Sequence, residues 1–153
     1  MSWLNLKIPP PAVGVLVALL MWLVAPLGPP LPLAPETAWT AALVFVAVGL
    51  SVDFLGLLSF RAARTTINPM RPQRSAVLVT GGIYRVTRNP MYLGMCSLLL
   101  GWAAWLSALA PLAGPPLFIA YMTRFQIRPE EEVLSKIFGA EYERYCTRVR
   151  RWL

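Results

Sequence analysis

Four apolar segments account for most of this chain and limit the folds open to it. Three of them cover about 12–27, 37–60 and 91–109, and the fourth runs from about Pro115 into the polar residues after Tyr121. The second and third have close to the ~20 residues that cross a ~30 Å hydrocarbon core, while the first and fourth need tilt or a continuing helix. Hydrophobic residues make up 57% of the sequence and charged residues only 14%. We predict a single all-α domain over residues 1–153, an integral membrane bundle of about four transmembrane helices with a cytosolic amphipathic C-terminal helix.

The positive charges are unevenly distributed, and this predicts an orientation. The net charge is +7, yet the connection before the second segment carries only Glu36 and the turn after the third segment carries no charge. The connection between the second and third segments and the C-terminal tail contain most of the arginines: Arg61, Arg64, Arg71, Arg74, Arg85 and Arg88, then Arg144, Arg148, Arg150 and Arg151. The positive-inside rule places both in the cytosol. Such clustering at a membrane surface makes nucleic acid a poor partner, and the high Ala, Pro and Arg content indicates a bacterial inner membrane.

Two alternatives concern the first segment and the cysteines. Lys7 precedes a short apolar stretch, which also fits a cleaved signal peptide, but we prefer a retained helix because a small bundle needs it. Cys96 lies in an apolar run and Cys146 in the basic tail, so no disulfide framework is predicted. The chain has no histidine, which excludes histidine triads, histidine metal sites and a histidine base. We predict no metal.

The first candidate site is the stretch Gly81–Gly94, where a polar loop meets an apolar helix. Asn89 is a good N-cap and Pro90 suits the first helical position, so we expect the helix to begin here. A helix N-terminus favours a carboxylate or phosphate, and Arg85 and Arg88 add to its positive field. The alternative is an ordinary membrane-entry segment with interfacial arginine and tyrosine anchors.

The second candidate site is the stretch Arg124–Leu134, where the fourth helix leaves the membrane. At 100° per residue Arg124, Arg128 and Glu131 share one narrow face, and Glu130 points elsewhere. The alternative is a solvated helix with Arg128–Glu131 pairs worth only ~0.2–0.5 kcal/mol. Pro129 either starts a new helix or kinks the old one.

Together these stretches resemble a family of membrane enzymes. Gly82-x-Tyr84-Arg85-x-x-Arg88-Asn89-Pro90-x-Tyr92-x-Gly94 is similar to the Gly-x-Tyr…Arg-His-Pro-x-Tyr-x-Gly motif of isoprenylcysteine carboxyl methyltransferases and phospholipid methyltransferases. Glu130-Glu131-x-x-Leu134-x-x-x-Phe138-Gly139-x-x-Tyr142-x-x-Tyr145-x-x-x-Val149-x-Arg151 is similar to the C-terminal motif of the same family. The resemblance covers 78–153, and the first two helices match only as membrane spans. Asn89 stands where eukaryotic members carry histidine, and an amide cannot act as an acid or base near neutral pH.

The resemblance implies methyl transfer from S-adenosylmethionine to a lipidic, prenylated or other hydrophobic acceptor at the cytosolic membrane face. It implies that the cofactor site is lined by Tyr84, Arg88, Asn89, Tyr92, Leu93, Gly94, Glu130 and Glu131. A carboxylate acceptor needs only an arginine to hold it, for which we choose Arg124 first and Arg128 second. An amine acceptor must lose a proton, and Glu131 is then the candidate base.

Other functions and other residues remain open at this level. Sterol and steroid reductases share a similar Arg-His-Pro-x-Tyr-x-Gly segment and would use NADPH, and a non-catalytic membrane scaffold is a further possibility. Asp53 is either functional, as intramembrane acids often are, or paired with Arg61 or Arg64. The stripe Gly94, Ser97, Gly101, Ala104 and Ala108 predicts a close helix–helix contact.

Overall fold

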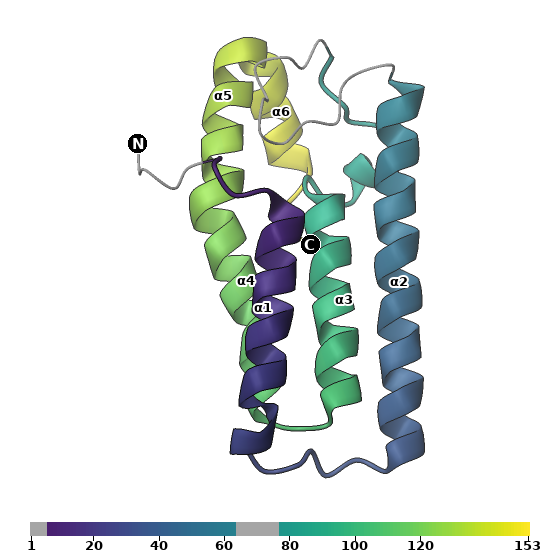
Figure 1. Ribbon diagram of the computed structural model, residues 1–153. Helices are drawn as coiled ribbons and strands as arrows, with labels where there is room; N and C mark the ends of the chain where they lie inside the picture. The colour runs from purple at the N-terminus through teal and green to yellow at the C-terminus, as the bar shows by residue number, and fades with distance from the viewer. Residues whose placement is uncertain (1–5, 64–76) are drawn as a thin grey trace.

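The computed structural model describes residues 6–63 and 77–153, and every regular element in these ranges is a helix. Four of them form the bundle in Figure 1: α1 (Pro10–Val24), α2 (Pro35–Ala62), α3 (Pro90–Leu106) and α4 (Gly114–Met122). A π-helical segment, η5 (Thr123–Ile127), carries α4 into α5 (Arg128–Phe138), and α6 (Ala140–Arg148) follows. Short 3₁₀ turns are η1 (Ala25–Leu27), η3 (Gly82–Arg85) and η4 (Ala110–Ala113). The all-α class is confirmed; Arg64, Arg71 and Arg74 lie outside the described residues.

Proline sets the start of the bundle helices. Pro10, Pro35 and Pro90 each occupy the first residue of a helix. The fixed φ of proline suits this position, where its missing N–H has no intrahelical partner in any case. The helix starts therefore fall within two residues of those predicted from hydropathy.

Two helices of the described chain are long and apolar enough to cross a membrane. They are α1 continued through η1, from Pro10 to Leu27, and α2 from Pro35 to Ala62. Apolar side chains such as Leu27, Leu43 and Phe54 on these helices are more than half exposed, as expected of surfaces that face lipid. α3 has 17 residues, and α4 has 9 but continues through η5 into α5. The four predicted segments are thus four helices, of which two meet the length expected of a full span.

α3 lies inside the bundle and packs against α1, α2 and α4. Its contact with α2 is close because glycines meet there: a Cβ on Gly94 would lie 2.8 Å from the Gly49 carbonyl oxygen, and one on Gly101 would lie 3.0 Å from the Ala42 carbonyl oxygen. Ser97 Oγ donates a 2.8 Å hydrogen bond to the Phe45 carbonyl of α2. The predicted packing role of this stripe is confirmed from Gly94 to Gly101.

Asp53 of α2 lies against the same stripe. Its Oδ1 is buried, has no hydrogen-bond partner within the described chain, and would be 2.1 Å from a Cβ on Gly94. No ion pair joins Asp53 to Arg61 in the part of α2 that the structure describes. The acid is therefore accommodated by the absence of a side chain at Gly94.

We predict that Gly94→Ala destabilises the fold by about 1–3 kcal/mol, the usual cost of overpacking. The new methyl group would overlap Asp53 and the Gly49 carbonyl. Gly14→Ala is the matched control, because nothing lies within 4 Å of a Cβ at that position of α1. Thermal unfolding in detergent measures both; equal midpoints for the two variants would contradict the close α2–α3 contact.

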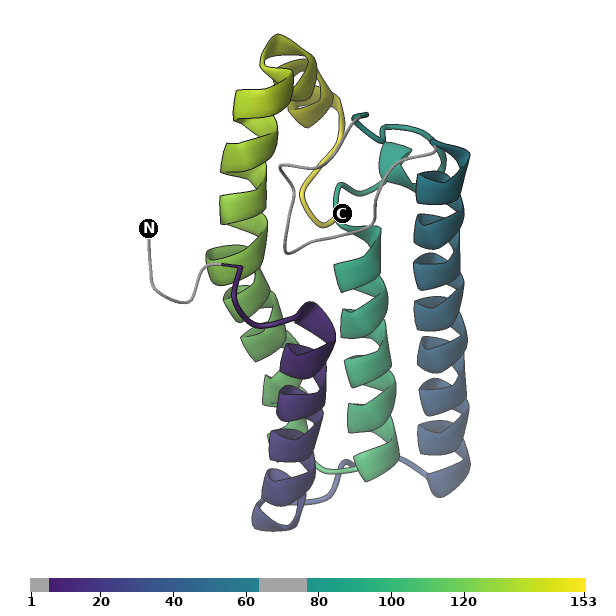
Figure 2. The same cartoon turned by 45° about the horizontal axis from the view of Figure 1, so that its top comes forward.

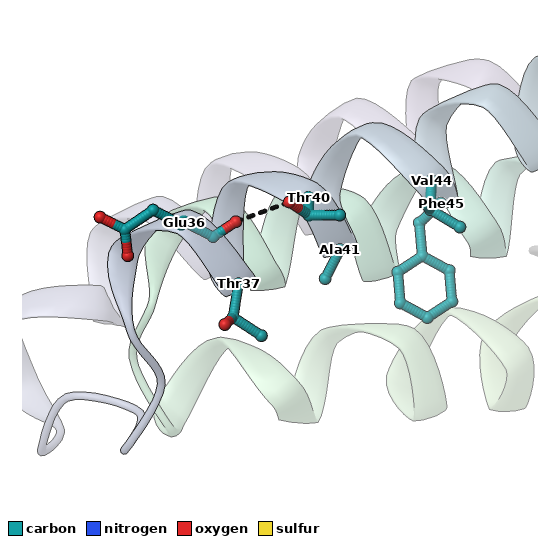
Figure 3. A pocket seen from close by; sticks show the side chains of 6 residues that line it. All are labelled: Glu36, Thr37, Thr40, Ala41, Val44 and Phe45. Atoms are coloured by element: carbon teal, nitrogen blue, oxygen red, sulfur yellow. Dashed lines mark hydrogen bonds between the residues drawn. The ribbon is translucent and has the colours of Figure 1, made fainter.

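An open hollow on the surface of α2 lies far from the end of the bundle that carries the arginines. It is open and lined by Glu36, Thr37, Thr40, Ala41, Val44 and Phe45 (Figure 3). Thr40 Oγ1 donates a 2.7 Å hydrogen bond to the Glu36 carbonyl within the helix. Because these residues lie at the start of α2, they are separated by the length of that helix from η3 and the start of α3 (Figure 1).

Candidate functional site

The two stretches singled out by the sequence lie at one end of the bundle. In Figures 1 and 2 this end holds the close of α2, η3, the start of α3, α5 and α6. The chain after α6 runs back between α5 and the start of α3 and contacts both stretches (Figure 2). The Arg88 backbone N–H donates to the Arg150 carbonyl at 3.0 Å, and Thr87 beside it is fully buried. The chain after α6 thus joins the two motifs.

Asn89 has a different role from the one predicted. α3 begins at Pro90 as expected, but the Asn89 side chain makes no capping hydrogen bond. Its Nδ2 instead donates a 2.9 Å hydrogen bond to the Arg151 carbonyl. The capping prediction was wrong because the nearby chain after α6 offers an acceptor that the local sequence does not reveal.

Glu131 is the centre of an arginine cluster. Arg151 makes a bidentate ion pair with Glu131, in which Nε lies 2.9 Å from Oε1 and Nη2 lies 2.7 Å from Oε2. Arg88 Nη1 lies 3.3 Å from the same Oε1. The side chains of Arg88 and Glu131 are 14% and 17% exposed. Arg88 also donates to Cys146 Sγ. The hydrogen bond and charge of Glu131 raise the pKa of Arg151. A bidentate pair of this kind has strict geometry, so Glu131 is tightly positioned.

Glu130 occupies a different environment although it is the next residue. Tyr92 Oη and Gln126 Nε2 both donate to its Oε1, the first at 2.7 Å. Burial raises the pKa of Glu130 to about 7; the negative charge of Glu131 adds to this rise, while the two hydrogen bonds oppose it. The two adjacent acids therefore have different partners: Glu131 is paired with arginines, and Glu130 accepts hydrogen bonds from neutral side chains.

The predicted Arg124–Arg128–Glu131 face is not formed. Arg124 and Arg128 are exposed, whereas Glu131 lies inside against Arg88 and Arg151. The reason is η5, in which the Arg128 N–H donates to the carbonyl of Thr123, five residues earlier. A π-turn breaks the 100° periodicity on which the prediction depended. Pro129 is the second residue of α5, which begins directly after the π-turn, so the expectation that it starts a new helix is confirmed.

The tyrosines of the C-terminal motif hold α6 against η3. Tyr145 Oη donates a 2.7 Å hydrogen bond to the Tyr84 carbonyl, and the Phe60 ring meets the Tyr84 ring edge-on at 5.5 Å. Tyr142 and Tyr145 are buried with Leu134 and Phe138. The aromatic set therefore packs the end of the bundle together; a further role in closing over a cofactor stays a prediction.

The structure brings together five of the eight predicted cofactor residues: Arg88, Asn89, Tyr92, Glu130 and Glu131. Tyr84 lies next to them under α6, Leu93 is partly exposed, and Gly94 faces α2. Sequence reasoning missed Gln126, Cys146 and the pairing made by Arg151. The i,i+4 spacing of Gln126 and Glu130 was a usable signal for the first.

Comparison with known proteins decides the family. A family model described as phospholipid methyltransferase matches residues 37–141, more than half of the chain. The chain belongs to the phospholipid methyltransferase family. The matched residues take in nearly all of α2, a helix that lies outside the two sequence motifs, and they end just before Tyr142. An uncharacterized protein of Haemophilus influenzae is 44% identical over 63 residues, which are 41% of this chain and all of that protein. No solved structure matches.

Family membership gives the chain a function. A phospholipid methyltransferase is a membrane enzyme that transfers a methyl group to lipid, in agreement with the apolar, exposed helices of this chain. Both motifs up to Glu141 lie within the matched residues. The cluster of Arg88, Tyr92, Glu130 and Glu131 is therefore the candidate active site.

Proposed function

We propose that this phospholipid methyltransferase family member transfers a methyl group from S-adenosylmethionine to a hydrophobic lipid acceptor at the cytosolic face of a bacterial inner membrane. The observation that carries the proposal is the polar cluster around Glu130 and Glu131, which lies inside the family match at the start of α3. The described arginines Arg61, Arg85, Arg144, Arg148 and Arg150 belong to the same end of the bundle and support the cytosolic orientation.

The residues present suit this cofactor. When bound, S-adenosylmethionine supplies a methyl group already activated by a sulfonium. Arg88 Nε is buried and has no hydrogen-bond partner in the described chain, so it is available to a carboxylate such as that of the methionine part. Glu130 and Glu131 offer negative charge to its ammonium. The protein would mainly exclude water and align the acceptor with the methyl group.

Titration of the purified protein separates the three functions considered. Calorimetry with S-adenosylmethionine and with NADPH should show binding of the first alone. Binding of NADPH alone would favour the reductase function, and binding of neither would favour a scaffold. The isoprenylcysteine-type alternative differs only in acceptor, so methyl transfer to a prenylated cysteine and to a phospholipid should be compared in the same preparation.

Asn89→Ala should lower the free energy of unfolding by about 1 kcal/mol, because the hydrogen bond to the Arg151 carbonyl is lost. It should weaken S-adenosylmethionine binding by more than that loss of stability accounts for, since Arg151 pairs with Glu131. Thermal unfolding and calorimetry measure the two effects. A lower unfolding midpoint with unchanged cofactor binding would mean that this segment is only a membrane-entry anchor.

We assign Arg124 to orientation of the acceptor, with Arg128 second, because both are exposed, Arg124 in η5 and Arg128 at the start of α5, within seven residues of Glu131 in the sequence. The Arg124 guanidinium lies 5.4 Å from the centre of the Phe125 ring. Arg124→Lys keeps the charge but loses the planar fork, so it should lower kcat roughly fivefold, equivalent to about 1 kcal/mol, with a phosphate-bearing acceptor. Cofactor affinity should be unchanged. Equal kcat in parent and variant would remove Arg124 from the acceptor site.

A further inference from the structure

We infer that anionic phospholipids of the membrane bind a surface formed by η3, α6 and the chain that follows α6. Four exposed arginines carry this surface, which we call the arginine face: Arg85, Arg144, Arg148 and Arg150. A cytosolic orientation requires only positive charge at this end of the bundle. The arginine face in addition binds one class of lipid, and its effect on the cofactor site, given below, rests on the proposed function.

Contacts between separate segments bring the arginine face together. The Tyr145 hydroxyl of α6 donates a 2.7 Å hydrogen bond to the Tyr84 carbonyl, which places α6 beside η3, where Arg85 lies. The Arg150 carbonyl accepts a 3.0 Å hydrogen bond from the backbone N–H of Arg88, three residues after Arg85. The two ends of the face therefore meet although they are far apart in the sequence.

The charges of α6 are segregated along its length. Glu141 and Glu143 occupy the first turn, whereas Arg144 lies at the middle of the helix and Arg148 in its last turn. The end of α6 is nearer the bundle than its start (Figure 1), so the arginines lie nearer the membrane than the acids. No arginine of this face forms an ion pair within the described residues. Gathered charges of one sign repel one another, which favours an anionic partner.

The end of α2 gives the level of the arginine face in the bilayer. Leu58 is 41% exposed and Arg61 lies in the last turn of this helix, so the apolar surface ends here and the headgroup region begins. The Phe60 ring meets the Tyr84 ring of η3 edge-on at 5.5 Å. Since α6 is hydrogen-bonded to Tyr84, the arginine face lies at the level of lipid headgroups.

Exposed apolar side chains beside the arginines favour a lipid over other anions. Val86, directly after Arg85, is 60% exposed, and Leu153, three residues after Arg150, is 66% exposed. A phosphate ion or a nucleic acid backbone offers these side chains no apolar contact. A membrane surface supplies phosphate groups to the guanidiniums and acyl chains to the valine and leucine. The partner that fits is therefore an anionic phospholipid.

The arginine face is continuous with the candidate active site. Arg151 follows Arg150 and pairs with Glu131, and the Arg151 carbonyl accepts a hydrogen bond from Asn89. A lipid phosphate held by Arg85 and Arg150 would join η3 to the chain after α6 and so keep Arg151 in place. Anionic lipid should therefore raise the affinity for S-adenosylmethionine.

Lipid binding is tested without turnover by thermal unfolding in neutral detergent. Titration with dihexanoylphosphatidylglycerol at low salt should raise the unfolding midpoint of the parent, and high salt should remove the rise by screening. Arg148→Gln and Arg150→Gln should each raise the half-saturating lipid concentration about fivefold, the usual weight of one arginine near an anionic surface. Lys136→Gln is the matched control, because it removes an exposed cation from the last turn of α5 and should match the parent.

Two comparisons separate a lipid from other anions. Dihexanoylphosphatidylcholine has the same acyl chains without net charge and should leave the midpoint unchanged. Val86→Ser should also raise the half-saturating concentration of the anionic lipid. A rise of the same size with inorganic phosphate or with heparin would overturn the inference in favour of a free anion or a polyanionic macromolecule. Equal half-saturating concentrations in the parent, Arg148→Gln and Arg150→Gln would overturn it as well.

Calorimetry separates this inference from the proposed function. Phosphatidylglycerol should raise the affinity of the parent for S-adenosylmethionine at least about fivefold, and S-adenosylmethionine should raise the affinity for the lipid by the same factor. The combined variant Arg148→Gln/Arg150→Gln should lose both effects. Failure of the parent to bind S-adenosylmethionine in either lipid would defeat the proposed function but leave the lipid-dependent rise in midpoint. Cofactor affinity independent of phosphatidylglycerol, in a parent that binds both, would overturn the coupling.

Discussion

Glu131→Gln should lower the free energy of unfolding by about 2 kcal/mol and weaken S-adenosylmethionine binding at least tenfold. Breaking a fully buried ion pair costs about 3–5 kcal/mol because the remaining charge is left unpaired. Arg151 is 34% exposed, so water compensates for part of this cost. The loss of affinity follows from release of Arg88 and Arg151, which border the proposed cofactor site.

Thermal unfolding and calorimetry in detergent measure the two effects. Glu132→Gln is the control, because it removes the same charge from the next, exposed residue of α5. Arg151→Met, alone and combined with Glu131→Gln, completes a double-mutant cycle. If the double variant lost the sum of the two single losses, the pair would contribute no coupling energy and the cluster would not be a structural unit.

The second large expected effect is a dependence of the free energy of unfolding on pH that comes from Glu130. Burial raises the pKa of Glu130 from 4.5 to about 7 in the folded state. Between these values the folded chain binds more protons than the unfolded chain, so the contribution of Glu130 to stability falls as pH rises. It is fully present below about pH 4.5 and lost above about pH 7, a difference of about 3 kcal/mol at 1.36 kcal/mol per pKa unit.

Glu130→Gln isolates this contribution from that of the other ionisable groups. The variant keeps a side chain that can accept from Tyr92, but it does not titrate. Its unfolding midpoint should therefore fall less than that of the parent when the pH is raised from about 5 to about 8. Parallel curves for the two proteins would show that Glu130 is ionised in the folded state at both pH values.

Hydropathy, together with Pro90, predicted most of the helical framework. The apolar segments became α1 to α4, and α3 begins at Pro90 as expected. The Gly94–Gly101 stripe predicted the α2–α3 contact. These features could be predicted because they depend on short-range rules: apolar length, the fixed φ of proline and the size of a side chain at a close helix contact.

The chemistry of the paired acids was decided only by the tertiary structure. Helical periodicity placed Glu131 with Arg124 and Arg128, but the π-turn Thr123–Ile127 changed which side chains face inward. The partners of the acids come from α3, the connection between η3 and α3, and the chain after α6, and Arg151 lies 20 residues beyond Glu131. A helical wheel of one segment cannot show these contacts, because they join different segments of the chain. Which acid is held by cations and which by neutral donors depends on distances between segments far apart in sequence, and these exist only once the chain has folded.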